Sequence, residues 1–308
     1  MRRLSNSGSA LLLIVFLAAG CVYAQFRSDT RLVVLHASVT DKHGKMLTTL
    51  KKDAFKVFEN GQLQPIKNFI REDVPVSLGI IIDDSGSMLT KRSRVEAAAL
   101  SLVKQSNPQD EVFIVNFNDE WYLDVPFTSD IHKMEQGIAK IDSRGGTAMR
   151  DAISASLDYM KDKARKDKKV LLIITDGNDN ASNTSLEKVV ARCNQSETLV
   201  YAIGLFTEEE KRDATKAKRA LNELTMTTGG LAFYPKDVSE VEAEASEIAT
   251  DIRNQYTITY TPNIQELDGS YRQIKVVVDG SGKPTVRTRS GYYATPEAHK
   301  AAATGGGS

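Results

Sequence analysis

The chain has few cysteines and histidines, which excludes two common ways of stabilising or equipping a fold. Two cysteines occur among 308 residues, and Cys21 lies in an N-terminal export signal, so Cys193 has no partner for an intramolecular disulfide. Cys193 follows Leu186 and Val189 at helical spacing, which predicts an inert thiol on the buried face of a helix. The four histidines are scattered without the spacing of zinc ligands, so no zinc site is expected.

An excess of charge of either sign is also absent. Forty basic and forty acidic side chains cancel, so the chain lacks the electropositive character of nucleic-acid-binding proteins, and no nucleic-acid partner is expected. Apolar residues make up 41% of the chain and charged residues 26%, which is the usual composition of a soluble globular protein. The length is that of one large domain or two modest ones.

No apolar run reaches the roughly 20 residues that a membrane-spanning helix needs, so no membrane span is expected. The apolar stretch at residues 10–19 follows two arginines and has the length of an export-signal core. The residues before Gln25 favour cleavage after Ala24. The alternative is lipoprotein processing, because residues 18–21 resemble a lipobox, although its usual leucine is absent. This processing would leave a lipid anchor on Cys21. Both outcomes predict a secreted, periplasmic or envelope-anchored protein.

Apolar strand patterns alternate with amphipathic helical patterns through the middle of the chain. Continuous apolar runs that are typical of buried parallel strands occur at residues 76–82, 112–117, 170–174 and 199–204. The clearest helical stripe is formed by Val95, Ala98, Ala99, Leu102 and Val103. This alternation predicts an α/β fold with a doubly wound, mostly parallel, Rossmann-like sheet, and residues 121–125 are expected to pair back as an edge strand.

The two flanks of this region show the two-residue alternation of half-buried strands. Residues 33–39 alternate apolar and polar, and residues 55–59 run into Asn60-Gly61, a strong hairpin signal. Beyond the last helical pattern, further strand patterns occur at residues 256–260, 271–278 and 285–289. Neither flank has enough strands for a sandwich, but together they have about seven. We therefore expect one small β-sandwich built from both flanks, with the α/β domain inserted into it.

These patterns divide the chain into five segments. They are an export signal (1–24), the N-terminal half of the sandwich (25–74), the inserted domain (75–253), the C-terminal half of the sandwich (254–293) and a disordered tail (294–308).

Hydroxyl and carboxylate side chains follow two of the apolar strands. Asp83, Ser85 and Ser87 come at the end of the first strand, and Asp176 ends a later one. Thr147 opens a helical pattern after two glycines. Parallel strands end at one edge of a sheet, where these oxygens would meet, and hard oxygen ligands are those that Mg²⁺ or Mn²⁺ prefers. The pattern predicts a metal site, with Ca²⁺ as an alternative ion.

Two other interpretations of the same residues exist. Each piece alone is also ordinary turn and N-cap chemistry. Phosphatases of the haloacid dehalogenase type also place an aspartate after a strand, with a second aspartate two residues later. Ser85 stands at that second position here, so the general acid of that mechanism is missing.

The three pieces in this order resemble the metal-ion-dependent adhesion site of von Willebrand factor A (VWA) domains. Together with residues 39–44, 53–61 and 290–293, they resemble the bacterial secreted VWFA-related family of acidobacterial type. The resemblance implies an ion held from three loops, with an open position that a Glu or Asp carboxylate of a partner protein fills. It also implies that Asp84, the variable position of the motif, faces solvent.

The resemblance implies an extracytoplasmic, metal-dependent protein-binding module for adhesion or assembly, and not an enzyme. One alternative is a hydrolase of the cell envelope that uses the metal to activate water. The other is a structural module that acts through its sandwich. Trp121 lies after residues 118–120 and could offer an aromatic contact near the site, although packing is the more usual role of such a residue.

Overall fold

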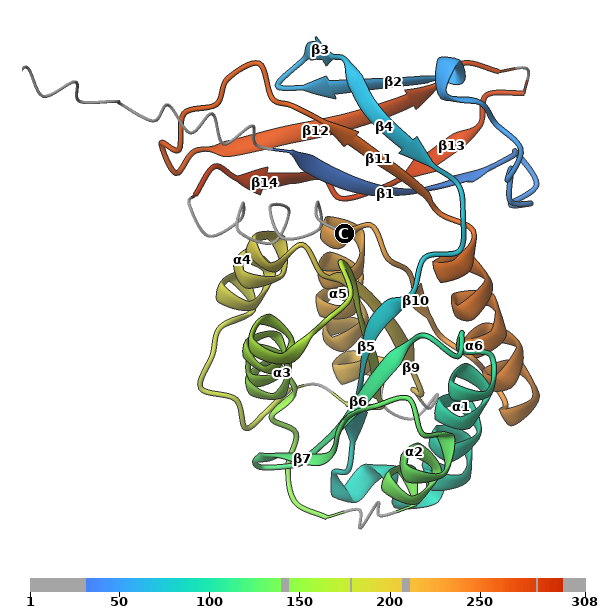
Figure 1. Ribbon diagram of the computed structural model, residues 1–308. Coiled ribbons are helices and arrows are strands. Elements are labelled where there is room, and N and C mark those ends of the chain that lie inside the picture. Colours follow the sequence, from blue (N-terminus) through green and yellow to red (C-terminus); the bar gives the residue numbers. More distant parts are fainter. Residues whose placement is uncertain (1–31, 140–143, 178, 207–210, 281, 296–308) are drawn as a thin grey trace, which may run out of the picture. The chain divides into compact units, whose positions relative to one another are not determined.

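The computed structural model describes residues 32–295 except 140–143, 178, 207–210 and 281 (Figure 1). The predicted export signal, with Cys21, and the tail from residue 296 lie outside the described residues. None of the helices in the described ranges is long and apolar enough to cross a membrane.

The inserted α/β domain is built around a six-stranded sheet in the order β10-β9-β8-β5-β6-β7. Its strands are β5 (Val76–Asp83), β6 (Glu111–Phe117), β7 (Trp121–Thr128), β8 (Lys168–Thr175), β9 (Leu199–Gly204) and β10 (Ala232–Phe233). All neighbours are parallel except β7, which pairs antiparallel with β6. The predicted doubly wound, mostly parallel sheet and its edge strand are therefore confirmed.

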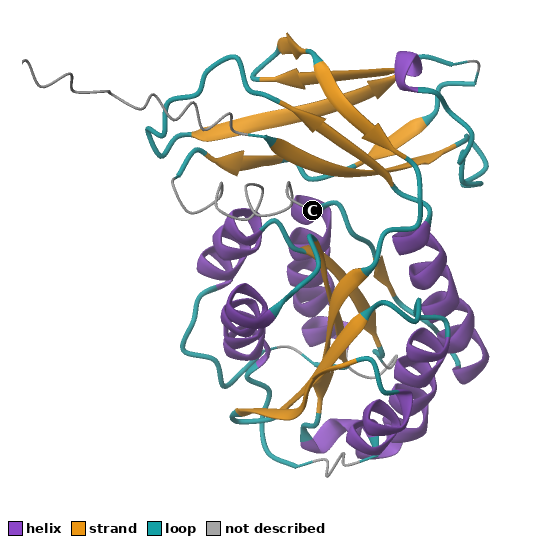
Figure 2. Cartoon of the chain, in the orientation of Figure 1, coloured by secondary structure: helices purple, strands orange, loops and turns teal. Residues whose placement is uncertain are grey.

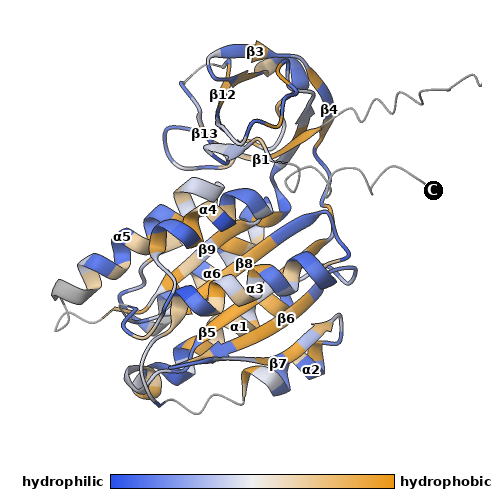
Figure 3. Cartoon of the chain, turned by 90° about the vertical axis from the view of Figure 1, so that its left-hand side faces the viewer, coloured by the Kyte–Doolittle hydropathy of each residue, from blue (hydrophilic) through white to orange (hydrophobic). Residues whose placement is uncertain are grey.

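Helices cover both faces of this sheet (Figure 2). They are α1 (Arg92–Lys104), α2 (Ile131–Ile138), α3 (Met149–Lys163), α4 (Leu186–Ser196), α5 (Lys211–Thr228) and α6 (Val238–Arg253), with a short 3-10 helix, η2 (Gly86–Lys91), before α1. Alternate residues of each strand serve the two faces: Ile80 and Ile82 pack with α1, α2 and α6, whereas Ile81 packs with α3, α4 and α5. The central strands are buried on both sides, and their middle residues are therefore mostly apolar (Figure 3).

Cys193 lies on the buried face of α4, as its helical spacing predicts. Burial in apolar surroundings raises the pKa of its thiol to about 12. The thiol therefore stays protonated and inert at physiological pH.

The flanks form two four-stranded antiparallel sheets. Their strands are β1 (Val33–Thr40), β2 (Phe55–Glu59), β3 (Gln62–Gln64), β4 (Ile66–Ile70), β11 (Tyr256–Tyr260), β12 (Tyr271–Val278), β13 (Thr285–Arg287) and β14 (Gly291–Tyr293), with a short 3-10 helix, η1 (Lys52–Ala54), before β2. One sheet has the order β13-β1-β11-β4 and the other β14-β12-β2-β3. Each sheet combines strands from both ends of the chain around one apolar core, which confirms the predicted sandwich with an inserted domain.

Glycine and proline set the turns that divide the N-terminal flank between the sheets. Asn60 and Gly61 both have positive φ and close the predicted hairpin between β2 and β3. Pro65 then separates β3 from β4, which pairs with β11 in the other sheet. At the far end, Ala294 was expected to belong to the disordered tail, but it is buried and its N–H donates to the carbonyl of Ser270.

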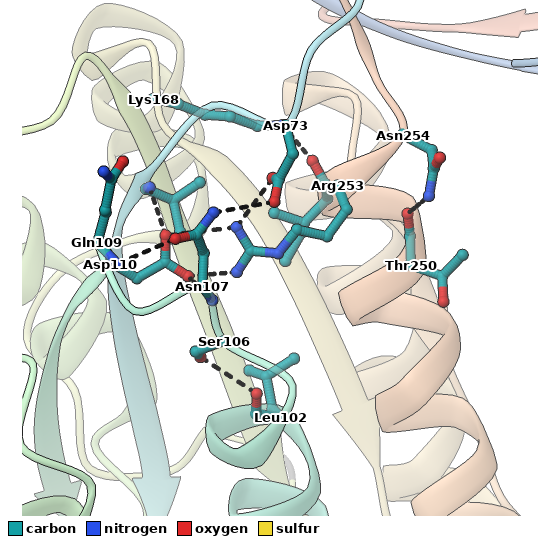
Figure 4. A network of polar contacts seen from close by, with 12 residues as sticks. Asp73, Leu102, Ser106, Asn107, Gln109, Asp110, Lys168, Thr250, Arg253 and Asn254 are labelled. Carbon is teal, nitrogen blue, oxygen red and sulfur yellow. Dashed lines mark hydrogen bonds and ion pairs between the residues drawn. The ribbon is translucent and has the colours of Figure 1, made fainter.

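Two chain segments join the sandwich to the inserted domain, one ahead of β5 and one after α6. Arg253, the last residue of α6, forms ion pairs with Asp73 in the first segment, at 3.1 Å, and with the buried Asp110 (Figure 4). Asp110 also accepts a hydrogen bond of 2.8 Å from the N–H of Val76, the first residue of β5. The entry and exit of the inserted domain are thus held together by one polar network.

Candidate functional site

The candidate site lies beside β5, where the order in which successive strands are added to the sheet changes direction. β5 has β6 on one side and β8 on the other, so the loops after β5 and β8 diverge from neighbouring carboxyl ends. Such a switch point is the usual binding crevice of doubly wound sheets. Asp83 is the last residue of β5, and Asp176 directly follows β8.

The loop after β5 brings its two serines against Asp176. The Ser87 hydroxyl donates to Oδ1 of Asp176 at 2.8 Å, and the hydroxyl oxygens of Ser85 and Ser87 are 3.1 Å apart. The N–H of Ser85 donates to Oδ1 of Asp83 at 2.9 Å, which fixes the start of the loop. Four of the predicted ligands are therefore connected by direct contacts.

Asp83 is fully buried and held by hydrogen bonds. Thr175, the last residue of β8, donates its hydroxyl proton to Oδ2 of Asp83 at 2.5 Å. Burial raises the pKa of Asp83 to about 6, and the nearby charge of Asp176 acts in the same direction, while the bonds from Ser85 and Thr175 oppose the rise. A cation beside Asp83 would favour its ionised form.

Residues 144–148, before α3, form the second loop, which places Thr147 next to the third loop, the one after β8. The N–H of Thr147 donates to the side-chain carbonyl of Asn180 at 2.9 Å, and the N–H of Asn180 returns a bond to the Thr147 carbonyl at 3.1 Å. A Cβ at Gly177 would lie 3.4 Å from the Thr147 hydroxyl oxygen and 4.0 Å from Oδ2 of Asp83. The bare Cα of Gly177 therefore leaves room between these two side chains.

Glycines of the second loop also connect it to the first loop and to the β6–β7 turn. The N–H of Gly86 donates to the carbonyl of Gly145 at 3.2 Å. The N–H of Gly146 donates to Asp119 at 2.9 Å, and Asp119 lies in the turn between β6 and β7. Gly145 has a φ of +76°, and a Cβ there would lie 2.3 Å from Asp119, so the loop requires glycine at this position.

The donor set fits a small divalent cation. It consists of three hydroxyls and two carboxylates, all hard oxygens. Neighbouring ligand oxygens around Mg²⁺, with bonds of 2.0–2.1 Å at right angles, would be about 3 Å apart. The Ser85–Ser87 and Ser87–Asp176 separations of 3.1 and 2.8 Å match that spacing. Across the described ranges, no group of three or more His, Cys, Asp and Glu residues is arranged for a metal, so the hydroxyls are essential to such a site.

Sequence reasoning missed three features of this region. Asp84 is buried rather than solvent-facing, because its N–H donates to the Phe117 carbonyl and its carbonyl accepts from the N–H of Arg144, so backbone covers it. Thr175 supports Asp83, and an apolar strand ending in threonine gives only a weak signal of such a role. Lys91 forms an ion pair with Asp176, whereas the sequence alone suggests that a lysine at this position is exposed to solvent.

Two large apolar side chains close in sequence to the candidate ligands and the β6–β7 turn are exposed to solvent. Leu89 lies in η2, two residues after Ser87, and is 64% exposed. Trp121, at the start of β7, is 47% exposed, so it is only partly used in packing.

Comparisons with known proteins agree with this fold. The chain is similar to a von Willebrand factor type A structure from Catenulispora acidiphila at 13% identity, covering 85% of this chain and 73% of that one, with a TM-score of 0.52. It also matches BatB from Bacteroides thetaiotaomicron (19% identity, 57% of this chain and 98% of that one, TM-score 0.48) and the vWF domain of the pilus tip protein Mfa5 from Porphyromonas gingivalis (12%, 58% and 95%, 0.49).

No curated protein matches the chain in sequence. Residues 78–178, which include the loops after β5 and β6 and the end of β8, match the family model of the von Willebrand factor type A domain. The doubly wound sheet and this match lead to one conclusion: the chain contains a von Willebrand factor type A domain.

Proposed function

We propose that this chain is an extracytoplasmic protein-binding module, for adhesion or assembly, whose VWA domain binds a partner through a divalent cation. The observation that carries the proposal is that the loops after β5 and β8 bring two hydroxyls and two carboxylates into contact at the carboxyl edge of the sheet. The hydroxyl of Thr147, from the second loop, lies across Gly177 from Asp83. The extracytoplasmic location rests on the export-signal pattern of residues 1–24.

Asp83, Ser85, Ser87, Thr147 and Asp176 would hold the ion, some of them through water. Mg²⁺ or Mn²⁺ suits this set best, and Ca²⁺ is the alternative. The ion would supply Lewis acidity toward one further anionic oxygen, which we assign to a Glu or Asp carboxylate of the partner protein.

The surrounding residues would keep these ligands in place. Thr175 holds the carboxylate of Asp83 through its hydroxyl, and Asn180 fixes the backbone that carries Thr147. Exposed Leu89 would offer the partner an apolar contact beside its carboxylate. We assign this arrangement to binding rather than catalysis, since both carboxylates would be taken up by the ion and the proposed ligands include no histidine.

The metal is tested by thermal unfolding of the purified protein near pH 8, where Asp83 is ionised. Saturating Mg²⁺ or Mn²⁺ should raise the Tm by roughly 5–10 °C, because binding to the folded state alone stabilises it. Asp83→Ala should abolish this shift and still unfold cooperatively, and Asp83→Asn, which keeps the side-chain volume, should behave in the same way. A wild-type Tm that is unchanged across saturating ions would remove the basis for the site.

The partner is tested by capture from a cell-envelope extract onto the immobilised protein, in Mg²⁺, Ca²⁺ or EDTA. Thr147→Ala removes one ligand and leaves the charge of the site unchanged, so it should lower the amount captured in Mg²⁺ by at least about tenfold. Thr147→Ser keeps the hydroxyl and should retain capture. Ca²⁺ should change the amount captured, because it accepts longer bonds and more ligands than an octahedral site offers.

Equal capture in all three conditions and by both variants would contradict the metal-dependent mechanism. Capture that survives Asp83→Ala would instead favour a module that binds through its sandwich. Phosphatase activity that the purified protein loses on Asp83→Ala would favour the hydrolase alternative.

A further inference from the structure

A buried lysine contacts the candidate site. Lys91 is the last residue of η2 and is 5% exposed. Its Nζ lies 2.5 Å from Oδ2 of Asp176, and the side chains of both residues are almost completely removed from solvent. An ammonium group in such a position needs a partner, because the loss of its hydration is costly unless an opposite charge replaces it.

Both oxygens of Asp176 are engaged in this arrangement. Oδ1 accepts the hydrogen bond from the Ser87 hydroxyl, and Oδ2 accepts from Lys91. Asp176 is one of the two carboxylates that we assign to the ion. The Lys91 ammonium therefore already pairs with Asp176, a carboxylate that the divalent cation would need as a ligand.

We propose that Lys91 is a tethered competitor of the divalent ion and sets the affinity of the site for it. This inference rests on the proposed function, since it concerns the same ion. Lys91 neutralises Asp176 and keeps the loops after β5 and β8 together when the ion is absent. When the ion binds, Lys91 has to withdraw from Asp176 or share it.

The physical reason is the repulsion between two cations in a buried site. At separations of a few ångströms and with little water between them, a divalent ion and an ammonium group repel each other strongly. Withdrawal of Lys91 also breaks a buried ion pair. Both effects weaken ion binding relative to a site without the lysine.

The experiment measures Mg²⁺ binding by calorimetry, and the Tm with and without Mg²⁺, for the full chain. Lys91→Met keeps the apolar stem of the side chain and removes its charge. It should lower the Tm in EDTA, because Asp176 loses its ion pair, and it should bind Mg²⁺ at least about tenfold more tightly than wild type. The Tm increase caused by Mg²⁺ should therefore be larger in the variant. Lys104→Met removes an equal charge from an exposed position at the end of α1 and should change neither quantity.

The outcomes separate this inference from the proposed function. Equal Mg²⁺ affinity in wild type and Lys91→Met, or weaker binding by the variant, would overturn the role of Lys91 while the metal site stands. Absence of binding by both proteins would overturn the metal site and the inference with it. Binding by the variant alone would support the competition and overturn the metal dependence of the natural protein.

A second variant covers the case in which Lys91→Met does not fold in EDTA. Lys91→Gln keeps a hydrogen-bond donor on a side chain of similar shape and removes the charge. Tighter Mg²⁺ binding by Lys91→Gln than by wild type supports the inference, and equal or weaker binding contradicts it.

Discussion

Deletion of residues 25–74 is expected to leave the C-terminal strands unable to fold. β11 lies between β1 and β4 and loses both neighbours, and β12 keeps only β14. The deletion also removes about half of the sandwich core. Its buried apolar residues in β1 and β2 are Val33, Leu35, Ala37, Val39, Phe55 and Val57. Their burial contributes on the order of 10 kcal/mol, which is comparable to the whole stability of a domain.

The result is measured by light scattering after size exclusion and by binding of a hydrophobic dye. Chains spanning 75–308 should form aggregates, because the edges of β11 are open to other chains. A chain of residues 75–253, which contains the complete six-stranded sheet, should remain monomeric with a cooperative transition. A monomeric 75–308 chain with a sharp unfolding transition would show that the C-terminal strands fold without the N-terminal ones. It would contradict the expectation that the two flanks depend on each other for stability.

Gly230→Ala is expected to be among the most destabilising single substitutions in the chain. The residue lies between α5 and β10, where a Cβ would be 1.8 Å from the carbonyl oxygen of Val200 in β9. The obstacle is backbone in the middle of a parallel sheet, so it cannot move aside as a flexible side chain would. We expect a loss of at least about 3 kcal/mol in the free energy of unfolding and a fall in Tm on the order of 10 °C.

Denaturant unfolding of Gly230→Ala should be compared with that of Gly280→Ala. Gly280 has ordinary backbone geometry, and a Cβ there would meet nothing closer than 3.7 Å. Both variants lose the same conformational freedom, so the difference between them reports the clash at Val200. Similar midpoints for the two variants would show that β9 and β10 can separate at little cost.

Periodicity was sufficient to predict the architecture of the inserted domain. Its central strands are apolar on both faces because helices cover both faces. Such strands appear in the sequence as continuous apolar runs, as at residues 78–82 and 170–174. The sandwich was predictable in kind, since neither flank supplies enough strands alone. The assignment of each strand to a sheet was not, because an alternating pattern specifies a buried face and not a neighbour. Pro65, which separates β3 from β4, reads only as a break.

The candidate ligands were predictable because each one lies next to an element with a strong pattern. Their supporting residues were not. Lys91 and Asp84 are charged residues in a loop and read as solvated, and their burial depends on how η2 and the second loop close over them. That closure is set by backbone bonds such as the one from Arg144 to Asp84, for which no side-chain type gives a signal.

The two segments that join the sandwich to the VWA domain have a mechanical consequence. Asp73 and Arg253 pair across them, so they run side by side. A domain on a single linker can swivel about it, whereas two adjacent linkers permit hinge bending and resist torsion. Tension applied at the carboxyl end of β5 would be divided between two covalent paths, and the pairing of the two segments would resist rotation of the loops that carry Ser87 and Thr147.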